Sequence, residues 1–368
     1  MSAQRSPLRM AVLFGGASTE HVISVRSARA VIAAADPNLI TTVPIAIDRG
    51  GVWRDVAASR ALVELFDRGG PECVPAIEGQ RGLLAAPQAL AALNDVDLAF
   101  PLVHGQTGED GSLQGLLELT GVPYVGAGVA ASAIGMDKAL MKAVFAQAGL
   151  PMPRATVVTA DGWAADPRGI ERELAAMPLP LFAKPANGGS SVGVVKIHNR
   201  EEIGPSVEKA LRFDRKVVVE EGIVGREIEC AVLARSSADA AADGRTAEAT
   251  HPGEIRTLRD FYDYTAKYED PSTELIVRAD LEPAVAARAQ ALAVRAFEAI
   301  DGSGFARVDF LLRGADEVLI NEINTLPGFT STSMFPRLWA AAGLPFDALI
   351  ARLAGLALAR ADGRRHRA

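Results

Sequence analysis

The sequence predicts an α/β protein, in which short buried strands alternate with helices and pair into a parallel sheet. Apolar runs typical of buried strands occupy residues 9–14, 41–47 and 96–100, and residues 20–35 carry apolar side chains at helical spacing. Residues 55–95 are rich in alanine without a clear pattern, and we expect surface helices and loops there. With 368 residues, the chain is long enough for two or three domains with substantial cores.

A boundary is expected near residues 123–128, where glycines and a proline interrupt the pattern. Beyond it, strands are expected where β-branched and other apolar residues run together, and helices where apolar spacing is close to one helical turn. The predicted elements are a helix that opens near Asp137, a helix at 168–176, strands at 179–184, 194–198, 217–220 and 227–234, a helix at 282–300, and strands at 305–312 and 317–323. A polar insert at 236–247 has no role that we can assign.

The composition excludes several classes of protein. Hydrophobic residues make up 49% and charged residues 23% of the chain, as in an ordinary globular protein and unlike a disordered or fibrous one. The formal net charge is −7, whereas general nucleic-acid and membrane-surface binders are usually basic. We expect the basic cluster of Arg364, Arg365 and Arg367 to be a frayed, solvated tail. No nucleic-acid or membrane partner is therefore expected.

Cysteine usage and hydropathy indicate the compartment. Cys73 and Cys230 lie far apart and form no CxxC motif, which suits a reducing environment and argues against a zinc site. The apolar run at 10–14 is too short for a signal peptide and is followed by two glycines. The longest uncharged stretch, 119–136, contains glycines and a proline and is a poor membrane span. We expect a soluble, cytoplasmic protein.

A glycine-rich run at 188–193 follows a strand that ends in Lys184. Small residues let backbone N–H groups close around phosphate oxygens, and the lysine adds a positive charge. A plain glycine-rich hairpin turn is the alternative for this segment taken alone. The run also matches the GxSxG nucleophile elbow with Ser191 as nucleophile, but that elbow leads into a helix, whereas the residues after 193 predict a strand.

A second loose motif, GxGxxA at 126–131, resembles a dinucleotide fingerprint. That fingerprint requires an acidic residue about twenty positions further on. No Asp or Glu lies between Asp137 and Asp161, so we reject a dinucleotide site.

Charged residues gather on two successive predicted strands near the C-terminal end. Arg307 and Asp309 alternate on the first strand, and Glu322 and Asn324 on the second, so each pair shares one face. Three oxygen donors on paired strands suit Mg²⁺, which water and nucleotide phosphates would complete. Arg307 would then clamp a transferring phosphoryl group. The alternative, a surface salt-bridge ladder, is disfavoured by the apolar neighbours of both strands.

Three carboxylates lie at or after the end of another apolar strand, and they indicate a nucleotide site only weakly. Glu220 and Glu221 end that strand and Glu227 comes soon after. A carboxylate placed there can accept hydrogen bonds from ribose hydroxyls, but a solvated strand end explains the pattern equally well.

Taken together, the motifs resemble the ATP-grasp ligases, and more closely the D-alanine–D-alanine ligase family. They extend from residue 11 to about residue 336, which is nearly the whole chain, and several are eight or more residues long. The segments that carry the resemblance are GGASTE at 15–20, HG at 104–105, GEDG at 108–111, Lys138, KPANGGSSVG at 184–193, the Glu220/Glu227 pair, YDYTAKY at 262–268, Arg307-x-Asp309 and NEINTLPGFT at 321–330.

The resemblance implies an α/β (α+β) fold with three domains: an N-terminal parallel-sheet domain at 1–126, a central ATP-grasp subdomain at 127–222 and a C-terminal catalytic domain at 223–368. A mobile lid is expected near 252–275, and ATP between the last two domains. The implied reaction is ATP-dependent ligation of two D-alanines through an acyl phosphate, for peptidoglycan precursor synthesis. The alternatives are a D-alanine–D-lactate ligase, another ATP-grasp carboxylate–amine ligase, or an ATP-binding module without ligase activity. An intact phosphoryl-transfer set argues against the last.

The resemblance also assigns roles to individual residues. The residues expected to bind the nucleotide are Lys138, Lys184, Ser191, Glu220, Glu227 and Lys267. Two Mg²⁺ ions, for which Mn²⁺ could substitute, would be bound by Asp309, Glu322 and Asn324. Glu20 and His104 would bind the first D-alanine, and Ser333 the second. Arg307 and the backbone at Gly328 would stabilise the oxyanion. Ser190 and Tyr268 would link Glu20 to the lid. A homodimer is expected. Without the resemblance, Glu20 is equally well explained by the dipole of a helix N-terminus, and His104 by a structural role.

Overall fold

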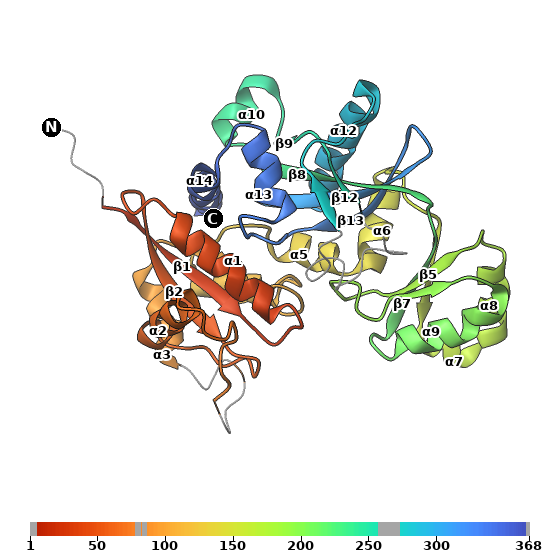
Figure 1. Ribbon diagram of the computed structural model, residues 1–368, viewed down its shortest axis with the longest axis horizontal. Helices are drawn as coiled ribbons and strands as arrows, with labels where there is room; N and C mark the ends of the chain where they lie inside the picture. Colours follow the sequence, from red (N-terminus) through yellow and green to blue (C-terminus); the bar gives the residue numbers. More distant parts are fainter. Residues whose placement is uncertain (1–5, 78–81, 83–86, 257–272, 366–368) are drawn as a thin grey trace.

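The computed structural model describes residues 6–77, 82, 87–256 and 273–365. Its strands form three sheets, which we name the N-terminal, central and C-terminal sheets. In Figure 1 the N-terminal and central sheets lie towards opposite ends of the longest axis, and the C-terminal sheet lies between them. Helices and strands are mixed throughout, as the sequence predicts.

The N-terminal sheet has three parallel strands in the order β2-β1-β3. Both faces of β1 are buried, which explains why its sequence is a continuous apolar run. The parallel sheet and its strands are therefore predicted correctly. The elements of this part are β1 (Leu8–Gly15), α1 (His21–Ala34), β2 (Ile40–Ile47), α2 (Val56–Asp67), α3 (Pro87–Ala91), a 3₁₀ turn (Ala92–Asp95), β3 (Leu98–Pro101) and α4 (Ser112–Thr120).

The central sheet has four antiparallel strands in the order β4-β7-β5-β6, which includes the three strands predicted there. Asp137 caps the helix that leads into it, accepting hydrogen bonds from the backbone N–H groups of Ala139 and Leu140. The elements are α5 (Val129–Met136), α6 (Lys138–Gln147), β4 (Ala155–Thr159), α7 (Ala160–Ala165), α8 (Pro167–Ala175), β5 (Leu181–Pro185), β6 (Val195–Ile197), a 3₁₀ turn (Arg200–Glu202), α9 (Ile203–Leu211) and β7 (Lys216–Glu221).

The C-terminal sheet has the order β11-β10-β8-β12-β13, with β9 paired to β8. The insert at 236–247 contains a helix, and the two ends of the expected lid are strands that pair with each other. The residues of the expected lid between these two strands, 257–272, lie outside the described residues. The elements are β8 (Gly225–Ala234), α10 (Ser237–Asp243), β9 (Ala247–Ala249), β10 (Gly253–Arg256), β11 (Glu274–Ile276), α12 (Pro283–Ala299), β12 (Phe305–Arg313) and β13 (Glu317–Asn324).

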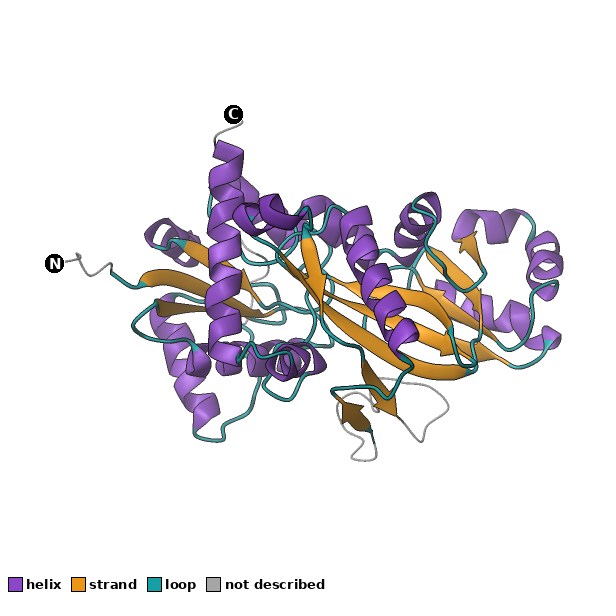
Figure 2. Ribbon diagram, turned by 90° about the horizontal axis from the view of Figure 1, so that it is seen from above, coloured by secondary structure: helices purple, strands orange, loops and turns teal. Residues whose placement is uncertain are grey.

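Two helices that the sequence analysis did not predict complete the chain, α13 (Met334–Ala341) and α14 (Phe346–Arg365). α14 packs against β3 and α1, and Figure 2 shows this long helix beside the N-terminal sheet. The expectation of a frayed basic tail is wrong up to Arg365, because α14 continues to that residue. No single described helix has the length and apolarity to span a membrane, and α13 and α14 meet that criterion only as a pair bent by 102°.

An aromatic cluster joins the N-terminal sheet to the C-terminal part of the chain. Phe305 and Phe329 are fully buried, with their ring centroids 5.6 Å apart. Phe100 lies 5.2 Å from Phe329, and Phe335 lies 5.2 Å from Phe305. Aromatic pairs at these separations add to the burial of apolar area. The relative position of the two sheets therefore depends on this cluster.

We predict that Phe305→Ala lowers the free energy of unfolding by about 3–5 kcal/mol, because truncating a buried phenylalanine leaves a cavity. Urea denaturation followed by circular dichroism measures the change. Leu119→Ala is the control, since the Leu119 side chain is 89% exposed and its loss should change stability by no more than about 0.5 kcal/mol. Equal effects of the two variants would contradict the central place of the cluster.

Candidate active site

The register of β12 and β13 brings the predicted charged residues together. Arg307 lies opposite Asn324, and Asp309 opposite Glu322, so all four share one face of the sheet as expected. The Arg307 guanidinium donates two hydrogen bonds of 2.6 Å to the carboxylate of Asp309. A β-bulge follows Asp309, after which the register changes.

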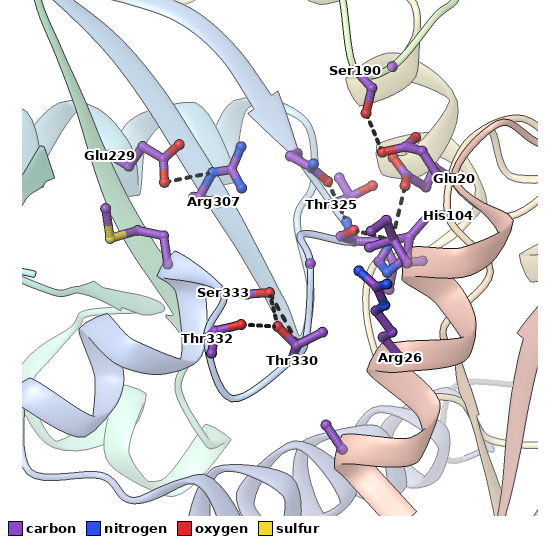
Figure 3. Close-up of a pocket in the computed structure, with 18 of the residues that line it drawn as sticks. Glu20, Arg26, His104, Ser190, Glu229, Arg307, Thr325, Thr330, Thr332 and Ser333 are labelled. Carbon is purple, nitrogen blue, oxygen red and sulfur yellow. Dashed lines mark hydrogen bonds and ion pairs between the residues drawn. The ribbon is translucent and has the colours of Figure 1, made fainter. Parts of the chain in front are cut away.

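Sequence reasoning missed a third carboxylate on this face, that of Glu229. It lies on β8 opposite Asp309, and its Oε2 is 3.2 Å from Nε of Arg307 (Figure 3). Glu229 is 3% exposed, so its charge is balanced locally by the guanidinium. The available signal was its spacing of two residues from Glu227 on a predicted strand, which places both on one face.

At the end of β7, the Glu220 carboxylate is buried between two lysines. It pairs with Nζ of Lys184 and, at 2.9 Å, with Nζ of Lys142, which lies on α6 and was missed by sequence reasoning. Burial raises the pKa of Glu220, but the two ammonium groups outweigh burial and lower it to about 2. Burial lowers the pKa of Lys184, and the charge of Glu220 more than compensates, so that pKa is raised. Both groups are ionised at neutral pH.

The glycine-rich loop turns back towards α1. Ser190 and Ser191 have φ of 50° and 58°, the left-handed region that permits so sharp a turn. Ser190 Oγ donates a 2.5 Å hydrogen bond to Oε1 of Glu20, and Lys138 Nζ donates to the carbonyl of Gly188 at 2.8 Å. Glu20 makes no side-chain capping hydrogen bond to its own helix. Its carboxylate faces the loop, which favours a role in the site.

His104 lies buried between α1 and the segment after β13. Its Nδ1 is 3.1 Å from the carbonyl of Leu326 and 3.4 Å from Oε1 of Glu109, and its Nε2 is 3.1 Å from Oγ of Ser27. Burial lowers the pKa of His104, but the hydrogen bond and charge of Glu109 outweigh it, so that pKa is raised. His104 is thus a satisfied buried group that also lies close to Glu20. Ser27 and Glu109 were not singled out from the sequence.

Two cavities meet at this site, with volumes of about 550 Å³ and about 180 Å³. Lys138, Gly188, Gly189, Ser190, Glu229 and Glu322 line both of them. The larger cavity is also lined by Glu20, His104, Arg307, Asn324, Gly328 and Ser333. The smaller cavity is also lined by Lys184, Ser191, Glu220, Glu227 and Asp309. Every predicted site residue that the structure describes therefore lines one or both cavities, whereas Lys267 and Tyr268 lie outside the described residues.

Hydroxyl groups line one wall of the larger cavity (Figure 3). Ser333 Oγ is 2.8 Å from Oγ1 of Thr330 and accepts a hydrogen bond from the Thr330 backbone N–H at 3.2 Å. A Cβ at Gly328 would lie 3.0 Å from Oγ of Ser333, so glycine lets the backbone approach that hydroxyl. The backbone at 328 and Ser333 thus face the same space.

The metal prediction rests on the chemistry of the donors. Within the described ranges, no group of three or more His, Cys, Asp or Glu side chains is placed to hold a metal ion. The predicted set has two carboxylates, Asp309 and Glu322, with the amide of Asn324, and Asp309 is paired with Arg307. Oxygen donors of this kind fit Mg²⁺, which keeps waters and needs only one or two carboxylates beside substrate phosphates.

A glycine-rich loop and Lys184 on one sheet, with Lys138 and Lys142 on the neighbouring helix α6, face a charged face of a second sheet, and this arrangement defines an ATP-grasp ligase. Residues 9–127 match the model of the D-ala D-ala ligase N-terminus, and residues 144–355 that of the C-terminus. The chain is 44% identical to the D-alanine–D-alanine ligase of Kineococcus radiotolerans, over 99% of this chain and 100% of that one. It belongs to the D-alanine–D-alanine ligase family.

Solved structures agree with this assignment. The D-alanine–D-alanine ligase from Coxiella burnetii superposes with a TM-score of 0.75 at 34% identity, over 98% of this chain and 97% of that one. The VanG D-Ala:D-Ser ligase from Enterococcus faecalis superposes with a TM-score of 0.76 at 33% identity, over 95% and 99%. The fold is therefore shared by a ligase named for D-alanine as the second amino acid and by one named for D-serine.

We predict that Glu220→Gln destabilises the fold by a few kcal/mol at pH 7, since each unit of pKa shift corresponds to about 1.4 kcal/mol. The folded-state pKa of about 2 lies below the ordinary value of 4.5, so the carboxylate stabilises the fold above about pH 4.5. That contribution is lost as the pH falls towards 2, and the two proteins should converge there. Urea midpoints from pH 2 to pH 7 measure this.

Glu208→Gln is the control for that series, because Glu208 is exposed on α9. Its midpoint should follow the wild type at every pH. A Glu220→Gln protein with the wild-type pH dependence would show that the two lysines do not hold the carboxylate in its charged form.

Proposed function

We propose that this protein uses ATP to join two D-alanines into D-alanyl-D-alanine, for the synthesis of peptidoglycan precursors. One observation carries the proposal: the lysine-lined cavity and the cavity that contains Glu20 meet along Lys138 and the glycine-rich loop. A phosphoryl donor in the first would therefore lie beside a carboxylate substrate in the second. The family membership of the whole chain supports the same reaction.

The chemistry explains why two joined cavities are needed. A carboxylate is a poor acyl donor, so ATP first converts the carboxylate of one D-alanine to an acyl phosphate. The amine of the second D-alanine attacks that carbonyl carbon, a tetrahedral oxyanion forms, and phosphate leaves. Water would hydrolyse the acyl phosphate, so the reaction requires an enclosed site.

Lys138, Lys184 and Ser191 line the smaller cavity and would bind the nucleotide, with the two lysines on the ATP phosphates. The family resemblance adds Lys267 to the phosphate-binding residues. Glu220 keeps Lys184 charged and oriented, which supports a phosphate-binding role for that lysine. Glu220 would also serve the adenine side and Glu227 the ribose hydroxyls.

In the larger cavity, Glu20 would bind the ammonium group of the first D-alanine, with His104 nearby. Ser190 donates to Glu20, which holds the carboxylate in place and ties it to the glycine-rich loop. Tyr268, on the lid, would extend this link when the site closes.

The second D-alanine would bind through its carboxylate to Ser333, close to the backbone at Gly328. Arg307 and the Gly328 N–H would stabilise the oxyanion, since preorganised donors lower the energy of developing charge. Glu229 and Asp309 hold the Arg307 side chain, which supports a fixed orientation of the guanidinium.

Asp309, Glu322 and Asn324 would hold two Mg²⁺ ions, for which Mn²⁺ could substitute. The ions would neutralise negative charge on the transferring phosphates. We further propose domain boundaries near residues 126 and 222, a homodimer, and a cytoplasmic location, where ATP is supplied.

We predict that Glu322→Gln lowers kcat by about 10²–10³-fold without unfolding the protein, since losing one electrostatic group of this kind has such an effect. Coupled ADP release at saturating Mg²⁺ measures it. Glu317→Gln, at the exposed start of the same strand, is the matched control and should keep the wild-type rate. Near-wild-type turnover of Glu322→Gln would remove Glu322 from the metal site.

We predict that D-alanine stimulates ADP release and that L-alanine does not. Because the chain also resembles a D-Ala:D-Ser ligase, the second substrate must be tested directly. A competition assay supplies D-alanine, D-serine and D-lactate at equal concentrations from pH 6 to pH 9. We expect D-alanyl-D-alanine to dominate at pH 7, with mass spectrometry resolving the products. In the family resemblance, Tyr268 marks peptide-forming enzymes, and Tyr268→Phe should slow ligation and loosen the discrimination. A depsipeptide majority at neutral pH would favour the D-alanine–D-lactate alternative.

A further inference from the structure

The segment from Leu326 to Phe329 is fastened at both ends by side chains from the N-terminal part of the chain. Nδ1 of His104 is 3.1 Å from the carbonyl of Leu326. The backbone N–H of Phe329 donates to Oγ of Ser27 at 3.3 Å. Gly328, whose backbone faces the larger cavity, lies between these two attachments.

Ser27 connects the two attachments to each other. It lies within α1 and is fully buried, and its Oγ is 3.1 Å from Nε2 of His104. Because Oγ accepts from the Phe329 N–H, the Ser27 hydroxyl hydrogen can be donated to Nε2 of His104. The imidazole then carries its hydrogen on Nδ1, where it donates to Leu326. The Leu326 carbonyl can only accept, so the hydrogen on Nδ1 is required by that partner, and Ser27 completes the arrangement by contacting both Nε2 and the Phe329 N–H.

These two bonds constrain the peptide plane between them. The carbonyl of Leu326 belongs to the plane before Pro327, and the N–H of Phe329 belongs to the plane after Gly328. The Gly328 N–H lies in the plane between those two, and the proline ring restricts rotation on one side of it. Fixing both outer planes therefore limits the directions in which the Gly328 N–H can point.

We propose that Ser27 is a positioning residue for the ligation reaction: through Phe329 and His104 it orients the backbone at Gly328 towards the developing oxyanion. The inference rests on the proposed function, because the oxyanion forms only in that reaction. Ser27 itself does not line either cavity and so acts through its two partners.

Apolar packing holds this segment in addition to the Ser27 hydroxyl. The Phe329 ring is fully buried and lies 5.2 Å from the Phe100 ring and 5.4 Å from the Phe346 ring. That packing holds the path of the chain even when the Ser27 hydroxyl is removed. Removal would release the orientation of the peptide planes and leave the segment in place.

The same helix offers a matched control, Ser24. It is also fully buried, and its Oγ accepts from the Gly15 N–H at 2.7 Å and donates to the Leu102 carbonyl at 2.5 Å. Both of these partners lie in or next to the N-terminal sheet. Ser24→Ala therefore removes a buried hydroxyl with two hydrogen bonds but leaves the attachments of Leu326 and Phe329 unchanged.

The experiment compares the full-length wild type with Ser27→Ala and Ser24→Ala by thermal unfolding and by steady-state ADP release with ATP and D-alanine. We expect Ser27→Ala to lower kcat at least tenfold, with the KM for ATP within twofold of the wild type. Ser24→Ala should lower Tm by at least as much and keep kcat within twofold. Ser27→Cys fills the site with a slightly larger side chain that hydrogen-bonds weakly. It should lose kcat like Ser27→Ala, and it replaces Ser27→Ala in the comparison if Ser27→Ala does not fold.

The outcomes separate this inference from the proposed function. An active wild type with Ser27→Ala or Ser27→Cys within twofold of its kcat overturns the positioning role alone. The positioning role is also overturned if kcat falls in proportion to Tm to the same extent in the Ser24 and Ser27 variants, since that result indicates a structural effect. A wild type that releases no ADP with D-alanine overturns the proposed function and this inference with it.

Discussion

The antiparallel register of β8, β12 and β13 is the constraint on which the site depends. Side chains alternate across a sheet, so a slip of one residue would turn Arg307, Asp309 and Glu322 towards the core and expose the apolar set. Their neighbours Val308 and Ile323 are buried in one hydrophobic core with side chains of α12, and this packing maintains the register. Glu229 joins the charged face through the same rule, so the two pairings of β12, with β13 and with β8, assemble the acids around the arginine.

The second requirement is closure of the site between parts of the chain that are distant in sequence. Three side chains from the N-terminal part provide it: Glu20 accepts from Ser190, His104 contacts the Leu326 carbonyl, and Ser27 accepts from Phe329. These bonds are buried or nearly so, where hydrogen bonds are electrostatically stronger than in water. Glu20, Ser190, His104 and Leu326 also line the larger cavity, so two of these three contacts form part of its wall, whereas Ser27 and Phe329 do not line it.

Much of the fold could be predicted from local pattern, because its strands are apolar runs with characteristic lengths. The strands at 9–14, 41–47 and 305–312 and the helix at 282–300 all form as expected. The helices α13 and α14 do carry a local pattern, since their buried side chains recur at helical spacing, and the sequence analysis did not use it. These side chains include Phe335, Leu338 and Trp339 on α13 and Leu349, Ile350 and Leu353 on α14. The ends of the expected lid form β10 and β11 because β8 offers an edge on which β10 pairs, and β10 in turn offers one to β11.

By itself, the sequence determined the fold class, the family resemblance and which charged residues share a strand face, because these follow from spacing along one or two neighbouring elements. Only the tertiary structure decided which groups balance those charges. Lys142 against Glu220, Glu229 against Arg307 and Ser27 against His104 each join residues more than 70 positions apart. Such a pairing leaves no local pattern, even where one of its residues does, because the partner is set by the packing of separate sheets and helices.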